Sequence, residues 1–84
     1  MSVTELIGYA AGTLTAVAFA PQVLKAWRSR DTSALSVGTL AIYVTGIIGW
    51  FVYGLLLDSL PIILSNFVSL ILASALLIAK LRFK

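Results

Sequence analysis

The chain lacks cysteine and histidine altogether, and only 11% of its 84 residues are charged. Without cysteine, no disulfide can stabilise a chain that is too short to bury much surface in water. Soluble domains carry about 25% charged residues, so the sequence also lacks the charged surface that keeps a fold in solution. These absences exclude a soluble domain, a disulfide scaffold and a nucleic-acid-binding protein, even though the net charge is +3.

The sequence contains instead three long runs without any charge. The runs cover residues 6–24, 32–57 and 59–79. A helix needs about 20 apolar residues to cross the hydrocarbon core, and in lipid the backbone must satisfy its own hydrogen bonds. We therefore predict an all-α integral membrane protein that forms a single bundle over residues 1–84. Its three transmembrane helices are expected at about residues 4–27, 37–57 and 61–81.

The basic residues predict how the bundle is oriented in the membrane. All six fall on one side of a three-span protein: Lys25, Arg28, Arg30, Lys80, Arg82 and Lys84. The positive-inside rule assigns that side to the cytoplasm, so the N-terminus is expected outside and the C-terminus inside. The second connection, residues 58–60, is so short that the second and third helices must form an antiparallel hairpin.

The absence of ionisable residues from the uncharged runs bears on mechanism. Proton pumps and proton-coupled exporters place an ionisable group at membrane depth. Its absence argues against a small multidrug exporter, a proton-driven rotor subunit and a proton-coupled carrier. A solute that crosses here should be uncharged and should move down its own gradient.

An aromatic ring and an amide are expected at matching depth on the hairpin. Trp50 lies nine residues before Ser59, in the middle of the short connection, and Asn66 lies seven residues after it. At 1.5 Å per residue, both lie about 10–14 Å below the outer end. A neutral sugar needs such a pair, because its C–H face stacks on a ring and its hydroxyls need donors and acceptors. Core packing of Trp50 and helix–helix bonding of Asn66 are the alternative interpretations.

The first helix contains a proline in its cytoplasmic third. Pro21 removes the hydrogen bond to the carbonyl of Val17 and is expected to kink the helix. Bent helices in transporters line cavities or serve as hinges; the alternative is an ordinary membrane proline. Gln22 beside it can satisfy the freed backbone groups or bond to a neighbouring helix.

One copy of the chain is not enough to enclose a solute path. Three thin helices leave no room between them, so the active unit is expected to contain more than one copy. Because every copy inserts the same way up, a homodimer about a two-fold axis along the membrane normal is the simplest arrangement. It would place two copies of Trp50 and Asn66 around one cavity.

Four segments carry a family resemblance. They are LIGY at residues 6–9, FAPQV at 19–23, GWFVYG at 49–54 and LPIILSN at 60–66. In this order and at this spacing they resemble the SemiSWEET sugar transporters of bacteria, in the SWEET and PQ-loop group. The resemblance implies a parallel homodimer in the bacterial cytoplasmic (inner) membrane, with helices packed in the order 1-3-2. It also implies a substrate pocket lined by Trp50 and Asn66.

The resemblance further implies alternating access between two gates. Pro21 and Gln22 would form the hinge near the inner gate, and Phe19 lies beside them. Tyr53 matches the outer-gate tyrosine of the family. Thr13 is a weaker candidate for the pocket.

The outer gate departs from the family pattern at one place. Several relatives carry an arginine and an aspartate after the gate tyrosine, where this chain has Leu57 and Ser59 with Asp58 between them. An Arg–Asp ion pair is therefore not expected here. Closure would rely on Tyr53 and on hydrogen bonding, with Asp58 as the second outer-gate residue.

These observations predict a uniporter for a mono- or disaccharide such as glucose or sucrose. Such a protein is not an enzyme and needs no cofactor and no metal ion. Its partners are a second copy of itself, the sugar and the lipid bilayer. The alternative is a small pore-forming or accessory membrane protein without sugar specificity of its own, which leaves the matched Trp50 and Asn66 unexplained.

Overall fold

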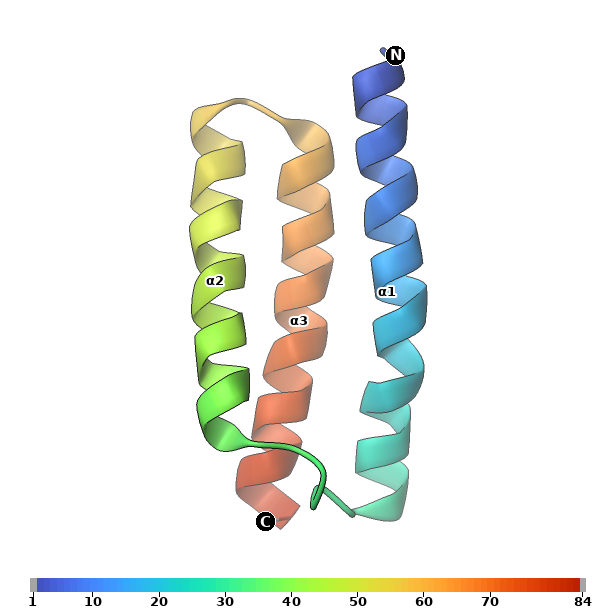
Figure 1. Cartoon of the computed structure of the whole chain (residues 1–84), viewed down its shortest axis with the longest axis vertical. Helices are drawn as coiled ribbons and strands as arrows, with labels where there is room; N and C mark the ends of the chain where they lie inside the picture. The colour runs from blue at the N-terminus through green and yellow to red at the C-terminus, as the bar shows by residue number, and fades with distance from the viewer. Residues whose placement is uncertain (1, 84) are drawn as a thin grey trace.

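The computed structural model describes residues 2–83 and consists of three long helices joined by two short connections (Figure 1). The helices are α1 at Val3–Ser29, α2 at Val37–Leu56 and α3 at Leu60–Phe83. Each is long and apolar enough to cross a membrane. Residues 2–83 contain no strand, so the predicted all-α, three-span fold is confirmed.

The ends of the helices follow from local residue chemistry. The hydroxyls of Ser2 and Ser36 accept hydrogen bonds from the backbone N–H groups of Glu5 and Thr39, and so cap α1 and α2. At the C-terminus of α1, Arg30 adopts the left-handed conformation (φ 56°) and its N–H donates to the carbonyl of Ala26. This cap stops the helix just before the α1–α2 loop.

Helix α3 lies between α1 and α2 (Figure 1), which confirms the packing order 1-3-2. The N-terminus and the α2–α3 turn lie at one end of the bundle, here called the turn end. The α1–α2 loop lies at the opposite end, here called the loop end. The two outer helices approach α3 closely at three glycines, Gly8, Gly12 and Gly54. A side chain there would collide with α3, so these residues permit the packing order.

The best-packed part of the bundle is the loop end. Ala26, Leu40, Leu76 and Ala79 are buried there from all three helices. The indole N–H of Trp27 donates to the carbonyl of Ala75 on α3 at 3.1 Å. The α1–α2 loop is also tied to α3, because Lys80 Nζ donates to the carbonyl of Thr32 at 2.9 Å. The helices are therefore held together most firmly at one end.

The overall dimensions fit a membrane but not a transport path. The principal extents are 43 × 21 × 14 Å, and a bilayer with its headgroups is about 40–45 Å thick. Large apolar side chains such as Val3, Ile42 and Leu56 are more than 70% exposed, as expected of surfaces that lipid covers. A body 14 Å thick is little wider than one helix with its side chains, about 10–12 Å.

Candidate transport site

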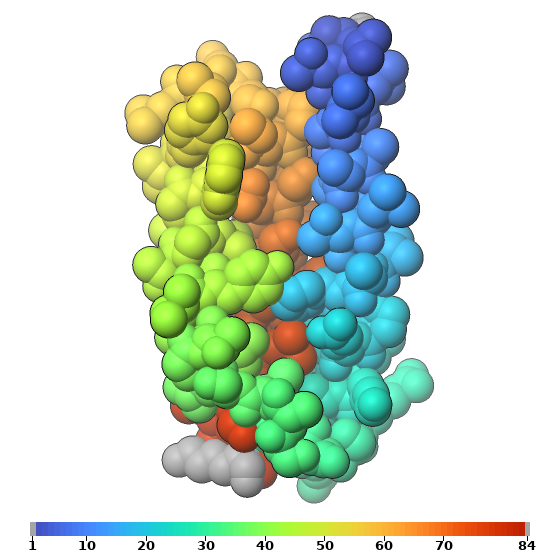
Figure 2. Space-filling view, viewed as in Figure 1, coloured from blue at the N-terminus to red at the C-terminus, as the bar shows by residue number. Residues whose placement is uncertain are grey.

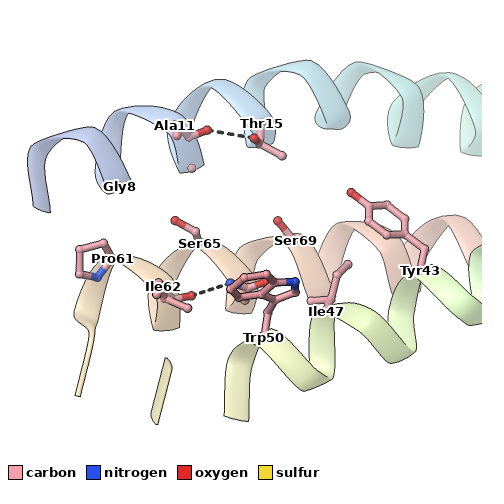
Figure 3. A pocket seen from close by; sticks show the side chains of 12 residues that line it. Gly8, Ala11, Thr15, Tyr43, Ile47, Trp50, Pro61, Ile62, Ser65 and Ser69 are labelled. Carbon is pink, nitrogen blue, oxygen red and sulfur yellow. Dashed lines mark hydrogen bonds between the residues drawn. The ribbon is translucent and has the colours of Figure 1, made fainter. Parts of the chain in front are cut away.

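A hollow of about 340 Å³ opens between α1 and α2, with α3 as its floor (Figures 2 and 3). In Figure 2, α3 is visible at the bottom of the groove between the two outer helices. All three helices contribute lining residues: Gly8, Ala11, Gly12, Thr15, Tyr43, Ile47, Trp50, Pro61, Ile62, Ser65, Asn66 and Ser69. The volume falls within the range of about 300–1,000 Å³ that is typical of small-molecule sites. We call this hollow the central cavity.

Trp50 and Asn66 both line the central cavity, from two different helices. The indole of Trp50 projects from α2 into the space between the helices (Figure 3) and is 57% exposed. Asn66 is half-buried, and its Nδ2 donates to the carbonyl of Ile62 at 2.9 Å. This bond uses one of the two amide hydrogens, so the other N–H and the carbonyl oxygen can serve a ligand.

An aromatic contact bounds the central cavity toward the loop end. The rings of Phe19 on α1 and Tyr43 on α2 have centroids 5.7 Å apart at an interplanar angle of 46°. The side chains thus bridge the groove between the two outer helices. Sequence reasoning singled out Phe19 but missed Tyr43. The available signal was spacing, because Tyr43 precedes Trp50 by seven residues and therefore lies on the same face of α2.

The hinge candidates lie away from the central cavity. Helix α1 continues through Pro21 to Ser29 without interruption, and Pro21 lines a surface hollow of about 400 Å³ beside Lys25. Gln22 lines a separate hollow of about 320 Å³ at the loop end, together with Asp31 of the α1–α2 loop. A hinge role concerns motion between states and stays a prediction for both residues.

Thr13 does not line the central cavity. It lies on another side of α1, in a hollow shared with Tyr9 and Val68, and its hydroxyl donates to the Tyr9 carbonyl at 2.8 Å. The threonine that lines the cavity is Thr15. Two residues along a helix correspond to a rotation of about 200°, which is why the two threonines face different surroundings.

The outer-gate candidates lie near the turn end. Tyr53 packs edge-on against Trp50, with ring centroids 5.5 Å apart and an interplanar angle of 88°. Together with Gly46 and Gly49, these two rings line a second hollow of about 330 Å³ on the exposed side of α2. Asp58 occupies the α2–α3 turn in the left-handed conformation (φ 56°), and its N–H donates to the Leu55 carbonyl. Aspartate tolerates this conformation better than most residues.

Charge is absent from the lining of the central cavity. At the loop end, the pKa of Asp31 lies below its ordinary value, chiefly because the Ser33 N–H and hydroxyl donate to the carboxylate at 3.0 and 2.8 Å. Nearby Lys25 and Lys80 lower the pKa further.

No group of three or more metal-ligating side chains occurs within residues 2–83. The cavity therefore offers ring surface and neutral hydrogen-bonding groups to a solute.

Comparison with known proteins places the chain in a family. Residues 3–63 match the model of the PQ loop repeat. The sugar transporter SemiSWEET of Bradyrhizobium diazoefficiens is 43% identical over 79 residues, which cover 94% of this chain and 92% of that protein. This chain belongs to the PQ-loop family, in its SemiSWEET group.

Other SemiSWEET proteins match over nearly the same length. The Leptospira biflexa sugar transporter SemiSWEET is 43% identical over 92% of this chain and 91% of its own length. Among solved structures, a bacterial homologue of SWEET transporters superposes with a TM-score of 0.92 at 35% identity, covering 99% of this chain and all of that one. A SemiSWEET in the inward-open conformation gives a TM-score of 0.88 at 35% identity, covering 98% of this chain and 88% of that one. The PQ-loop fold and a multi-pass membrane location are thus established, and the SemiSWEET relatives are transporters rather than enzymes.

Proposed function

We propose that this chain carries a neutral mono- or disaccharide across the bacterial inner membrane by facilitated diffusion. One observation supports the proposal above all: Trp50 and Asn66 meet in a single cavity whose lining carries no charge. The naming of the relatives from B. diazoefficiens and L. biflexa as sugar transporters supports the same solute class. With no charged group to move a proton, the sugar would travel down its own gradient.

Binding in this cavity would combine stacking with hydrogen bonding. The C–H face of a sugar ring packs on the indole of Trp50, and the free N–H and carbonyl oxygen of Asn66 bond its hydroxyls. A carrier must release its solute, so weak binding suffices. A dissociation constant near 1 mM corresponds to about 4 kcal/mol.

Alternating access would exchange closure at one end for closure at the other. Here the Phe19–Tyr43 contact bounds the central cavity at the loop end, while the cavity extends to Gly8 and Pro61 near the turn end. In the opposite state this contact separates and Tyr53 closes the turn end. Pro21 would allow the bend, because its ring removes a backbone hydrogen bond from α1.

The working unit would be a homodimer with a two-fold axis along the membrane normal. One protomer leaves the central cavity open on the side opposite α3, in a body 14 Å thick. Gly46 and Gly49 support the placement of the second copy at the exposed side of α2. A methyl group at either glycine would meet no atom within 4 Å in one protomer. Glycine lowers helix stability and commonly permits close helix approach in membranes; a second copy supplies the approaching helix.

The loop end would face the cytoplasm, because five of the six basic residues lie there: Lys25, Arg28, Arg30, Lys80 and Arg82. The sixth, Lys84, lies outside the described residues. Since the chain has no cysteine, single substitutions can test this orientation. A membrane-impermeant maleimide added to intact cells should label Glu5→Cys and spare Ser33→Cys. The reverse pattern would invert the assignment of inner and outer gates.

Sugar flux is tested with the purified chain in proteoliposomes. Counterflow of radiolabelled glucose and sucrose should be measurable, should ignore an imposed pH gradient and should be lost in Trp50→Ala and Asn66→Ala. Thr45→Ala is the matched control, because its hydroxyl bonds the Ala41 carbonyl of its own helix and lines none of the hollows described above. A pore would pass all small solutes equally, and an accessory protein would pass none; either result refutes the proposal.

A further inference from the structure

Hydroxyl groups inside membrane helices usually bond to their own backbone, and this chain shows the pattern clearly. Thr13, Thr15 and Thr45 each donate to the carbonyl four residues earlier, at 2.8–2.9 Å. Ser65 and Ser69 on α3 differ, because neither hydroxyl bonds a protein group in the part of the chain that the structure describes. Their hydrogen-bonding capacity is therefore available to something else.

The two serines face the central cavity. Both are half-buried cavity-lining residues, and Figure 3 shows their hydroxyls pointing from α3 toward α1. They lie four residues apart, so the hydroxyls repeat after about 6 Å along the helix. At membrane depth a hydroxyl without a partner is costly. Both serines line the central cavity, and Ser65 also lines the hollow beside Thr13. A hydroxylated solute or water must therefore supply the partner.

The packing of α1 leaves room for the first of these hydroxyls. A methyl group at Gly12 would overlap the Ser65 Oγ, so the missing side chain on α1 is what accommodates it. Asn66 adjoins Ser65 on α3 and lines the same cavity. Three neutral polar groups of α3 thus line the same cavity as the aromatic rings of Trp50 and Tyr43 on α2.

We infer that Ser65 and Ser69 bond individual sugar hydroxyls and determine which sugars are carried, an inference that rests on the proposed sugar-transport function. Stacking on Trp50 is tolerant, because many pyranoses present a similar C–H face. Two hydroxyls fixed one helical turn apart are selective, because they match only some arrangements of sugar hydroxyls. A site built to bond a hydroxyl rejects the analogue that lacks it.

The test combines serine variants with sugars that lack one hydroxyl. Counterflow of radiolabelled D-glucose is measured in proteoliposomes that contain wild type, Ser65→Ala or Ser69→Ala. For each protein, unlabelled D-glucose and its 2-, 3-, 4- and 6-deoxy analogues serve as competitors. Wild type should discriminate against at least one analogue by about 3- to 10-fold, the value of one neutral hydrogen bond. That discrimination should disappear in the variant whose serine bonds the missing hydroxyl.

Ser74→Ala is the matched control. Ser74 is also a half-buried serine of α3 without a protein partner, but it is absent from the lining of the central cavity. Its analogue ratios should equal those of wild type. Quenching of tryptophan fluorescence by the same sugars, measured in a Trp27→Phe background so that Trp50 is the one remaining indole, gives the ratios independently of transport rate.

Two results would overturn the inference, and they differ in what else they affect. If wild type carries sugar but both serine variants keep the wild-type ratio for every analogue, the serines are not ligands and the proposed function stands. If wild type shows no sugar counterflow, the proposed function fails and the inference fails with it.

Discussion

The glycines of α2 provide a sharp test of which contacts belong to one protomer and which to a pair. Gly54 packs against α3: an added methyl group would lie 2.7 Å from Ile62 Cγ2, 3.1 Å from Ile62 Cβ and 3.2 Å from the backbone N of Ile63. Carbon atoms in favourable contact are about 3.5–4.0 Å apart. The Gly54→Ala substitution therefore forces α2 and α3 to separate or distorts the first turn of α3.

The cost of this substitution can be bounded. Overpacking of a well-packed site typically costs about 1–3 kcal/mol, and alanine returns up to about 1 kcal/mol through its higher helix propensity. Because one of the obstructing atoms at Gly54 belongs to the backbone, relief by side-chain rotation is limited. We expect a net loss of about 1–2 kcal/mol in the free energy of unfolding, a factor of about 5–30 in the folding equilibrium.

Gly46 is the matched position, because an added methyl group meets nothing within 4 Å there. Gly46→Ala should leave the unfolding free energy of one protomer unchanged or slightly raised, and should weaken dimerisation. Unfolding is followed by circular dichroism during SDS titration of protein diluted to the monomer in mild detergent; dimer content is followed by energy transfer between labelled copies in vesicles. If Gly54→Ala and Gly46→Ala lower the free energy of unfolding equally, Gly54 does not differ from Gly46 in serving contacts within one protomer, and the reasoning is refuted.

Three further predictions concern the loop end. The pKa of Asp31 is lowered below its ordinary value of 3.8, so its hydrogen bonds from Ser33 are present above pH 3.8 and are lost as the pH falls through the pKa of the folded protein. The NMR resonance of the Ser33 amide should shift over that acidic range. A resonance that stays constant would contradict the hydrogen bonding. Trp27→Phe removes the bond to the Ala75 carbonyl and should lower the unfolding free energy by about 0.5–1.5 kcal/mol; a larger loss would mean that packing dominates. Leu76→Ala empties a buried core position and should cost about 2–5 kcal/mol in the same SDS titration, whereas a loss below 1 kcal/mol would show that lipid or neighbouring side chains refill the site.

The elements of the bundle were predictable because a membrane makes local sequence decisive. An uncharged run of about 20 residues in lipid must become a helix whatever its neighbours are. The shared depth of Trp50 and Asn66 was predictable for a similar reason, since the rise per residue is fixed and the turn at Ser59 supplies a common origin. The presence of both side chains in the central cavity agrees with that expectation of depth.

The side of a helix on which a residue lies was much harder to predict than its depth along the helix axis. Thr13 and Thr15 have the same chemistry and nearly the same depth, yet only Thr15 lines the central cavity. Phe19 was singled out without its partner Tyr43, because their contact joins α1 and α2, which are separated by α3 for most of their length. Both cases depend on how each helix is rotated against its neighbour.

The class of the protein and its three uncharged spans can thus be read from the order of the residues, because each depends on the transfer of single residues between water and lipid. The packing of the helices against one another was needed to show which glycines serve contacts within a protomer and which hydroxyls remain available to a solute. Gly12 and Gly46 are alike as residues but differ in what lies opposite them. What lies opposite a residue is a property of two helices together, and the sequence of either helix alone does not contain it.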